Sequence, residues 1–246
     1  MVEDCDSCET GRGDVKGPVR YLSDILAGKR HVEIESRLLN YSLGTTTALT
    51  GAGVVAYAVL LQGMQLSVDL SLIFLAIICS VTTLFAYHHV MHYGKNMSCA
   101  NGMMAGMTLG MISGFMAGAL IGATNGMFIG SVGGMMIGIS LGGNLGRCTG
   151  VMGAMEGIMA GIMAGIMGAM TSVMMINDNL VAFLFLLFGI CTFVLGGLSY
   201  MMYREAGITP LAKPVGFGRF LAISMVFSIA LVVLMVYGPK GPITYP

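Results

Sequence analysis

Long apolar stretches, interrupted by short polar or glycine-containing segments, make up most of the chain after residue 42. A helix needs roughly 20 apolar residues to cross the hydrocarbon core of a bilayer. This pattern predicts seven membrane spans, near residues 43–62, 70–91, 98–122, 126–142, 150–175, 179–202 and 217–237. We therefore expect an all-α integral membrane protein whose transmembrane domain covers residues 43–237.

The third and fourth stretches are separated only by a short polar break that contains Asn125. One continuous helix over residues 102–142 would be roughly 60 Å long, which is twice the hydrocarbon thickness. We therefore expect the chain to turn near Asn125. The two stretches either cross the membrane fully or form a re-entrant pair, and both alternatives leave the orientation of the other spans unchanged.

Lysine and arginine are distributed unevenly between the two sides of the predicted bundle. The first, third and fifth connections carry none, and the C-terminal segment carries only Lys240. The other eleven of the twelve are Arg12, Lys16, Arg20, Lys29, Arg30, Arg37, Lys95, Arg147, Arg204, Lys213 and Arg219. Because cytoplasmic loops are rich in these residues, we predict a multi-pass protein of the cell (inner or plasma) membrane, with its N-terminus in the cytoplasm and its C-terminus outside.

The segments before and after the spans have different characters. Residues 1–42 form the predicted cytoplasmic tail, and residues 1–19 lack the apolar core of a secretory signal and predict a flexible segment. Residues 20–42 alternate apolar and charged positions at near-helical spacing, which predicts amphipathic helices on the inner membrane surface or an ordinary helix leading into the first span. Residues 238–246 are expected to form a short external tail.

Composition narrows the function classes. The chain is 56% hydrophobic and 10% charged, whereas soluble domains carry about 25% charged residues. A net charge of zero argues against nucleic-acid partners. No Ser–His–Asp arrangement, P-loop or dinucleotide fingerprint occurs in the required context. We therefore expect a non-enzymatic protein whose partner is the lipid bilayer, with further copies of itself or other membrane subunits as additional partners.

Glycine recurs every fourth residue from residue 102 to residue 150, and then at the same spacing, one residue out of register, from residue 153 to residue 165. Small residues four apart let membrane helices approach until their backbones touch. We expect glycine-zipper packing of the third, fourth and fifth spans, within one molecule or at an oligomer axis. The expected packing positions include Gly102, Gly106, Gly110, Gly114, Gly118, Gly153, Gly157, Gly161 and Gly165.

Methionine is concentrated in a Met/Gly-rich core over residues 97–175, which holds 17 of the 24 methionines. At about 100° per residue, seven methionines of the fifth span fall on one stripe about 120° wide, and the glycines fall on the opposite side. Glu156 lies inside this stripe and is the only acidic residue well inside a predicted span. The seven methionines are Met152, Met155, Met159, Met163, Met167, Met170 and Met174.

Two interpretations of this stripe remain open. Methionine is flexible and fills irregular gaps beside glycine, so the stripe is compatible with packing alone. Thioethers also select Cu(I), and an ionisable residue within a span usually faces a partner or a watery cavity. Further sulfurs from the third and fourth spans could meet the stripe, namely Met103, Met107, Met111, Met127, Met135 and Met136.

Candidate ligands also gather at the predicted cytoplasmic end. The inner ends of the second and third spans, with the connection between them, hold His88, His89, His92, Met97 and Cys99. Imidazole binds copper and zinc, and two histidines one turn apart present both rings on one helix face. The tail adds a C-x-x-C pair, Cys5 and Cys8, which can coordinate Cu(I) or supply half of a zinc site. The histidines are equally compatible with an interfacial layer, and the cysteines with a redox pair.

The M-x-x-x-M spacing, together with glycines four apart and a Cys/His-containing cytoplasmic end, resembles the copper transporters of the Ctr type. Met159 and Met163, or Met163 and Met167, match that family's membrane methionine pair. Ctr proteins have three spans and form trimers, so the resemblance covers motifs only. The segment "MEGIMAGIMAGIMGAM" is also similar to parts of Met/Gly-rich bacterial membrane proteins over roughly residues 88–175, which implies heavy-metal handling and no catalytic residues.

The leading hypothesis is therefore Cu(I) transport or handling along a methionine-lined helix face, with Cu(I) as the one expected metal. Glu156 would supply charge compensation or a coupled proton. Two alternatives follow from the same residues: a non-catalytic accessory subunit of a larger membrane complex, and a glycine-zipper homo-oligomeric channel with Glu156 at its pore.

Overall fold

A computed structural model describes residues 44–51, 66–93, 99–147, 150–206 and 217–239, and every regular element in these ranges is a helix. A short helix over residues 44–51 precedes six long ones. The long helices are α3 (Leu66–Tyr93), α4 (Cys99–Asn125), α5 (Met127–Gly146), α6 (Val151–Met174), α7 (Leu180–Ala206) and α8 (Phe217–Tyr237). The predicted all-helical class is confirmed for this part of the chain.

Each of the six long helices is apolar and long enough to cross a membrane. They correspond to the second to seventh predicted spans, so the chain is a multi-pass helical membrane protein by length and composition. Of the first predicted span, near 43–62, residue 43 and residues 52–62 lie outside the described residues, as do the tail over 1–42 and most of the C-terminal segment. The side of the membrane on which each end lies stays a prediction.

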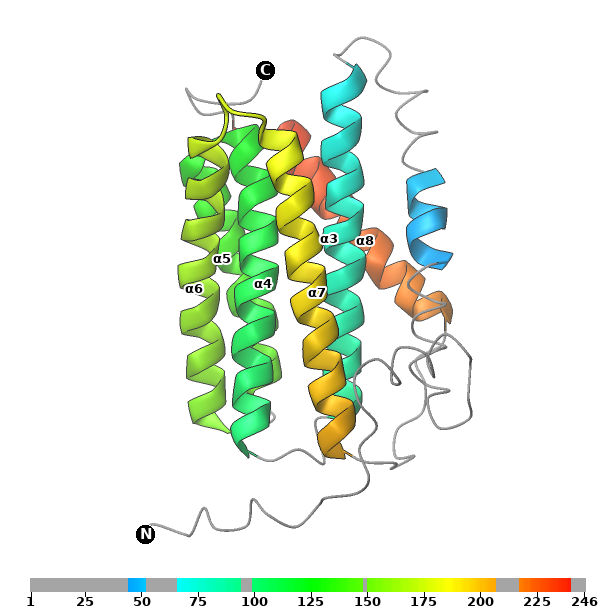
Figure 1. Cartoon of the computed structure of the whole chain (residues 1–246), viewed down its shortest axis with the longest axis vertical. Helices are drawn as coiled ribbons and strands as arrows, with labels where there is room; N and C mark the ends of the chain where they lie inside the picture. Colours follow the sequence, from blue (N-terminus) through cyan, green and yellow to red (C-terminus); the bar gives the residue numbers. More distant parts are fainter. Residues whose placement is uncertain (1–43, 52–65, 94–98, 148–149, 207–216, 240–246) are drawn as a thin grey trace.

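The long helices run alternately up and down through one bundle (Figure 1). α4 is the central helix, because it contacts α3, α5, α6, α7 and α8. α5 and α6 lie on one side of it, α3 and α7 lie on the other, and α8 crosses behind at an angle. α6 packs mainly against α4 and α5, so it is an outer helix with one side uncovered by the described chain.

Two different kinds of packing hold the bundle together. On the α3–α7–α8 side, large side chains interlock in a conventional apolar core with α4, including Leu75, Leu109, Leu184 and Phe188. The buried hydrophobic positions of α7 recur every three or four residues, which places them on a single face: Leu180, Leu184, Phe188, Cys191, Leu195, Leu198 and Met202.

On the α4–α5–α6 side, glycine backbones meet directly. The contacts form successive layers, and each layer contains one residue from each of the three helices. Neighbouring layers are one helical turn apart along α4, α5 and α6. The layers, from the α5–α6 connection upward in Figure 1, are Gly106–Gly146–Gly153, Gly110–Gly142–Gly157, Gly114–Gly138–Gly161, Gly118–Gly134–Gly165 and Gly122–Gly130–Ala169. We call these the glycine layers. A Cβ atom on Gly138 would lie 2.8 Å from the Cα of Gly161, so no larger residue fits without a shift.

The register of these layers explains the one-residue slip in the glycine spacing. The α4–α5 pairs are symmetric about Gly126, so the four-residue spacing continues unchanged through that turn. The α5–α6 pairs are symmetric about a point between positions 149 and 150, so the glycines of α6 must be displaced by one residue to face those of α5. The slip therefore keeps the layers aligned across two turns of different length.

Both turns rely on a glycine with positive φ. Gly126, directly after α4, has φ 93° and ψ 171°, and Gly150, directly before α6, has φ 97° and ψ −171°. This combination is essentially restricted to glycine. The predicted turn near Asn125 is thus present as a break of one residue between α4 and α5, and each of these helices meets the length and apolarity needed for a full span.

Candidate functional site

α6 has two faces of opposite character. Its buried positions are small residues that contact α4 and α5, among them Gly157, Gly161 and Gly165. The seven methionines of the sequence stripe all lie on the opposite side with exposed fractions between 40% and 70%: Met152, Met155, Met159, Met163, Met167, Met170 and Met174. We call these seven the methionine face. These side chains point away from the bundle and do not line a path inside it.

Glu156 lies among these methionines and is exposed. It is five residues into α6, which corresponds to about 7.5 Å from the start of the helix. Within the described part of the chain, no hydrogen bond or ion pair engages its carboxylate. The arrangement is therefore one carboxylate beside a column of thioethers, all facing away from the protomer.

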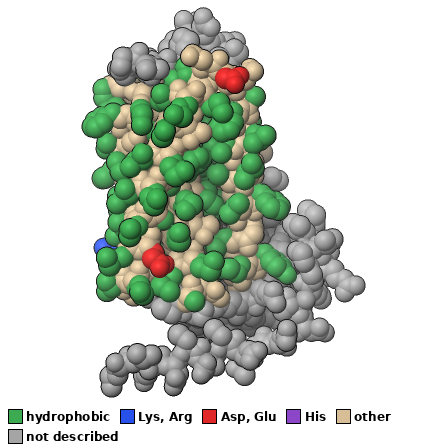
Figure 2. All heavy atoms as spheres, turned by 60° about the vertical axis from the view of Figure 1, so that its left-hand side comes forward, with side chains coloured by type: hydrophobic (Ala, Val, Ile, Leu, Met, Phe, Trp, Pro, Cys, Tyr) green, Lys and Arg blue, Asp and Glu red, His purple; other side chains and the backbone are tan. Residues whose placement is uncertain are grey.

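The outward surfaces of α7 and α8 have a different composition. The large exposed residues of α7 and α8 are almost all branched or aromatic, with Met225 as the one methionine: Phe185, Leu186, Ile190, Phe193, Val194, Ile223, Val226, Ile229, Val233, Leu234 and Val236. Figure 2 shows hydrophobic side chains covering the face that includes α6. Because both kinds of surface are apolar, general lipid contact does not account for the difference in methionine content between α6 and the pair α7 and α8.

The methionines of α4 and α5 are divided between surface and interior. Met104, Met107 and Met111 are exposed at helical spacing on α4, whereas Met116 is fully buried. On α5, Met127 and Met136 are exposed. Met103 and Met135 are half-buried. The three helices that share the glycine layers, α4, α5 and α6, therefore each carry exposed methionines.

The predicted histidine ligands point in different directions. His89 is buried, with its ring stacked on Phe85 at a centroid distance of 6.0 Å. His88 is half-buried, and its ring centroid lies 5.6 Å from that of Phe220 on α8. Because α3 packs against α4, α7 and α8 while α6 lies beyond α4 and α5, the structure does not bring these histidines to the methionine face within one protomer.

Several other predicted ligands lie outside the described residues. These are Cys5, Cys8, Met97 and the side chains of His92 and Cys99. Among the described residues, no group of three or more His, Cys, Asp or Glu side chains is arranged to hold a metal ion. Thioether sulfurs are a separate class of ligand, which favours Cu(I).

The structure also shows side-chain environments that the sequence did not predict, although it predicted the turn near Asn125. Asn125 is buried and donates a hydrogen bond from Nδ2 to the backbone oxygen of Leu234 at 2.6 Å, which joins the α4–α5 turn to α8. Ser224 is buried on the inner face of α8, and its Oγ has no hydrogen-bond partner among the described residues. A single asparagine or serine in an apolar chain carries no periodic signal, so neither could be assigned in advance.

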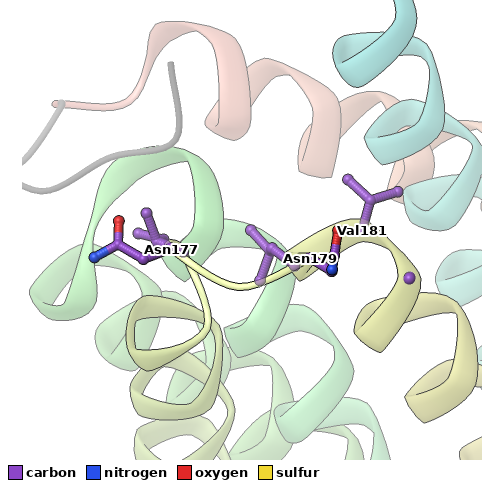
Figure 3. Close-up of a pocket in the computed structure, with 6 residues that line it drawn as sticks. Asn177, Asn179 and Val181 are labelled. Atoms are coloured by element: carbon purple, nitrogen blue, oxygen red, sulfur yellow. The ribbon is translucent and has the colours of Figure 1, made fainter.

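An open pocket of about 530 Å³ lies at the turn between α6 and α7. Its lining includes Asn177, Asn179, Leu180 and Val181. Figure 3 shows Asn177 pointing away from Asn179 and Val181, so the labelled side chains do not converge on one ligand position. We assign no binding role to this pocket.

Comparison with known proteins adds no assignment, because no family model, no curated protein and no solved structure matches this chain.

Proposed function

We propose that this protein handles a soft metal ion, Cu(I), along the methionine face of α6. The observation that supports the proposal is the complete separation of the two faces of this helix: all seven methionines are exposed and the glycines are buried against α4 and α5. Thioethers are soft ligands that favour Cu(I) over harder cations. We also infer that the glycine layers constitute glycine-zipper packing, which holds α6 rigidly so that its outer face keeps a fixed geometry.

Methionines on the face follow one another at intervals of three or four residues, so successive sulfurs are spaced by about one helical turn, or about 5 to 6 Å along the axis. Methionine has three rotatable side-chain bonds, which lets neighbouring sulfurs approach the same ion. An ion bound by one pair could therefore pass to the next pair along the helix. Glu156, at one end of the column, would offset the positive charge of the ion or carry a coupled proton.

The path does not run between α4, α5 and α6. In that interface a Cβ atom on Gly142 would lie 2.6 Å from the backbone oxygen of Gly157 and 2.9 Å from the Cα of Gly110. No space remains there for an ion with its ligands. The same observation weakens the alternative of a channel assembled through glycine contacts between copies, because the glycines of these helices are already in contact within one protomer.

The second candidate function is an accessory subunit of a larger membrane complex. It is favoured by the outward direction of the methionine face, since flexible methionines suit a surface that packs against partner helices. It predicts that the protein co-purifies with other subunits and that Cu(I) does not bind to α6.

A Cu(I) titration of the full chain in lipid nanodiscs distinguishes these functions. The test variant replaces Met159, Met163 and Met167 with leucine, which preserves apolar volume and removes the sulfurs. The matched control replaces Ile158, Ile162 and Ile166 with leucine, because these residues lie on the same helix and are also exposed. We expect the methionine variant to lose at least half of the bound Cu(I) and the isoleucine variant to bind like the wild type. Equal binding by all three proteins overturns the proposal.

A further inference from the structure

The uncovered side of α6 carries a charge that the described protomer leaves unpaired. Glu156 is exposed within a candidate membrane span over Val151–Met174. A charged side chain in a span is costly at the centre of the bilayer and less so near its ends. A surface that meets only lipid would normally avoid such a residue, so something other than lipid is expected to cover it.

An unpaired positive charge lies close to the same depth. Arg147 follows α5 directly and is exposed, and no described residue forms an ion pair with it. The antiparallel register of α5 and α6, in which Gly146 faces Gly153 and Gly142 faces Gly157, sets position 147 level with position 152. Glu156 is then about 6 Å deeper at 1.5 Å per residue, a distance that the long side chain of an arginine can span.

The two charges lie on opposite flanks of the methionine face. Ile158 flanks α5, because a Cβ atom on Gly143 would lie 3.1 Å from its Cγ1. Residues two apart on a helix point about 200° apart around its axis, so Glu156 lies on the flank away from α5. Arg147 directly follows the last residue of α5 and therefore lies on the other flank. This separation prevents the pair from closing within one protomer.

We propose that a second copy of this chain covers the methionine face in a two-fold symmetric dimer, with Glu156 of each copy beside Arg147 of the other. A two-fold axis parallel to α6 places the α5 flank of each copy opposite the Glu156 flank of the other copy. The interface therefore contains this contact twice. All copies share one membrane orientation, so equal positions lie at equal depths. Two-fold dimers are the commonest symmetric assembly, and the methionines between the two charge pairs then pack against their counterparts.

This dimer does not depend on metal binding, although it would enclose the path of the proposed function between two methionine faces. The experiment therefore measures the dimer fraction of the full chain in lipid nanodiscs by native mass spectrometry, with no metal added. A dimer that binds no Cu(I) would support this inference while overturning the proposed function.

The variants target the charge pair directly. We expect Glu156→Gln and Arg147→Gln each to weaken dimerisation by about tenfold, which corresponds to about 1.4 kcal/mol. The charge-swapped double variant, Glu156→Arg with Arg147→Glu, should recover most of the wild-type dimer, an outcome that a misfolded protein would not give. Asp178→Asn is the control, because Asp178 is an exposed acid just past the other end of α6; it should dimerise normally.

Three results overturn the proposal: a wild-type protein that is monomeric, glutamine variants that dimerise as well as the wild type, or an α6 face occupied by a different protein in purified complexes.

Discussion

Gly118 of α4 and Gly165 of α6 lie so close together that a Cβ atom on Gly118 would be 2.6 Å from the carbonyl oxygen of Gly165. Real Cβ atoms do not approach backbone atoms this closely, so an alanine here requires the helices to separate. In a membrane, where no hydrophobic force drives helices together, such close van der Waals contact is a main source of helix association. The glycine layers therefore fix the position of α6 and, with it, the direction of its methionine face.

Replacing Gly118 with alanine should destabilise the protein. Overpacking of a tight interface typically costs about 1 to 3 kcal/mol, so we expect a clear fall in Tm by thermal unfolding in detergent micelles. Gly196→Ala on α7 is the matched control, because nothing lies within 4 Å of the added Cβ. It should be neutral or slightly stabilising, since alanine favours helix more than glycine does. Equal effects of the two substitutions would argue against the observed packing.

Gly126 and Gly150 should reject every L-residue, including asparagine. Asparagine often replaces glycine at positive φ, but the ψ values of 171° and −171° place these two residues in a region that only glycine occupies readily. We expect Gly126→Asn and Gly126→Ala to lower stability by a similar amount, about 1 to 3 kcal/mol. A Gly126→Asn protein as stable as the wild type, measured by the same unfolding assay, would mean that the turn has another conformation.

The hydrogen bond from Asn125 to Leu234 should stabilise the contact of α8 with the α4–α5 turn. Hydrogen bonds between membrane helices contribute about 0.6 kcal/mol on average and up to about 1.7 kcal/mol. Asn125→Ala should therefore lower the free energy of unfolding within that range. Asn144→Ala, at an exposed position near the end of α5, should have no measurable effect. If the two variants behave alike, the bond from Asn125 contributes nothing to stability.

The uneven distribution of lysine and arginine predicts the membrane orientation. Alkaline phosphatase fused after Asp178 should be active, because the α6–α7 turn is expected outside, and the same enzyme fused after Arg147 should be inactive. The two sites lie at opposite ends of α6, so each serves as the control for the other. Activity at Arg147 with none at Asp178 would reverse the orientation of the whole protein.

Apolar length alone predicted most of the architecture. The ends of α5 and α6 differ from the predicted spans by a few residues at most, and the turn near Asn125 was expected because one helix of that length could not fit the bilayer. The grouping of methionines and glycines on opposite sides of α6 also followed from helical periodicity, since burial separates Met163 from Gly161 as the spacing indicates.

The sequence could not predict which neighbouring helix covers each helix face. Periodicity gives the angle between two residues on one helix and says nothing about which helix covers them. The sequence therefore could not show that α6 is an outer helix, that its methionines face away from the protomer, or that His88 packs against Phe220 of α8. These facts argue against a metal path inside one protomer. They point instead to the methionine face, which a second copy would cover.

X-ray absorption at the copper edge, measured on protein purified from copper-supplied membranes, identifies the ligands of any copper bound to the methionine face. We expect Cu(I) surrounded mainly by sulfur, with this signal lost when Met159, Met163 and Met167 become leucine and retained when Ile158, Ile162 and Ile166 do. Protein without copper, or copper with unchanged sulfur ligation in the methionine-to-leucine variant, would contradict a metal-handling role for this face of α6.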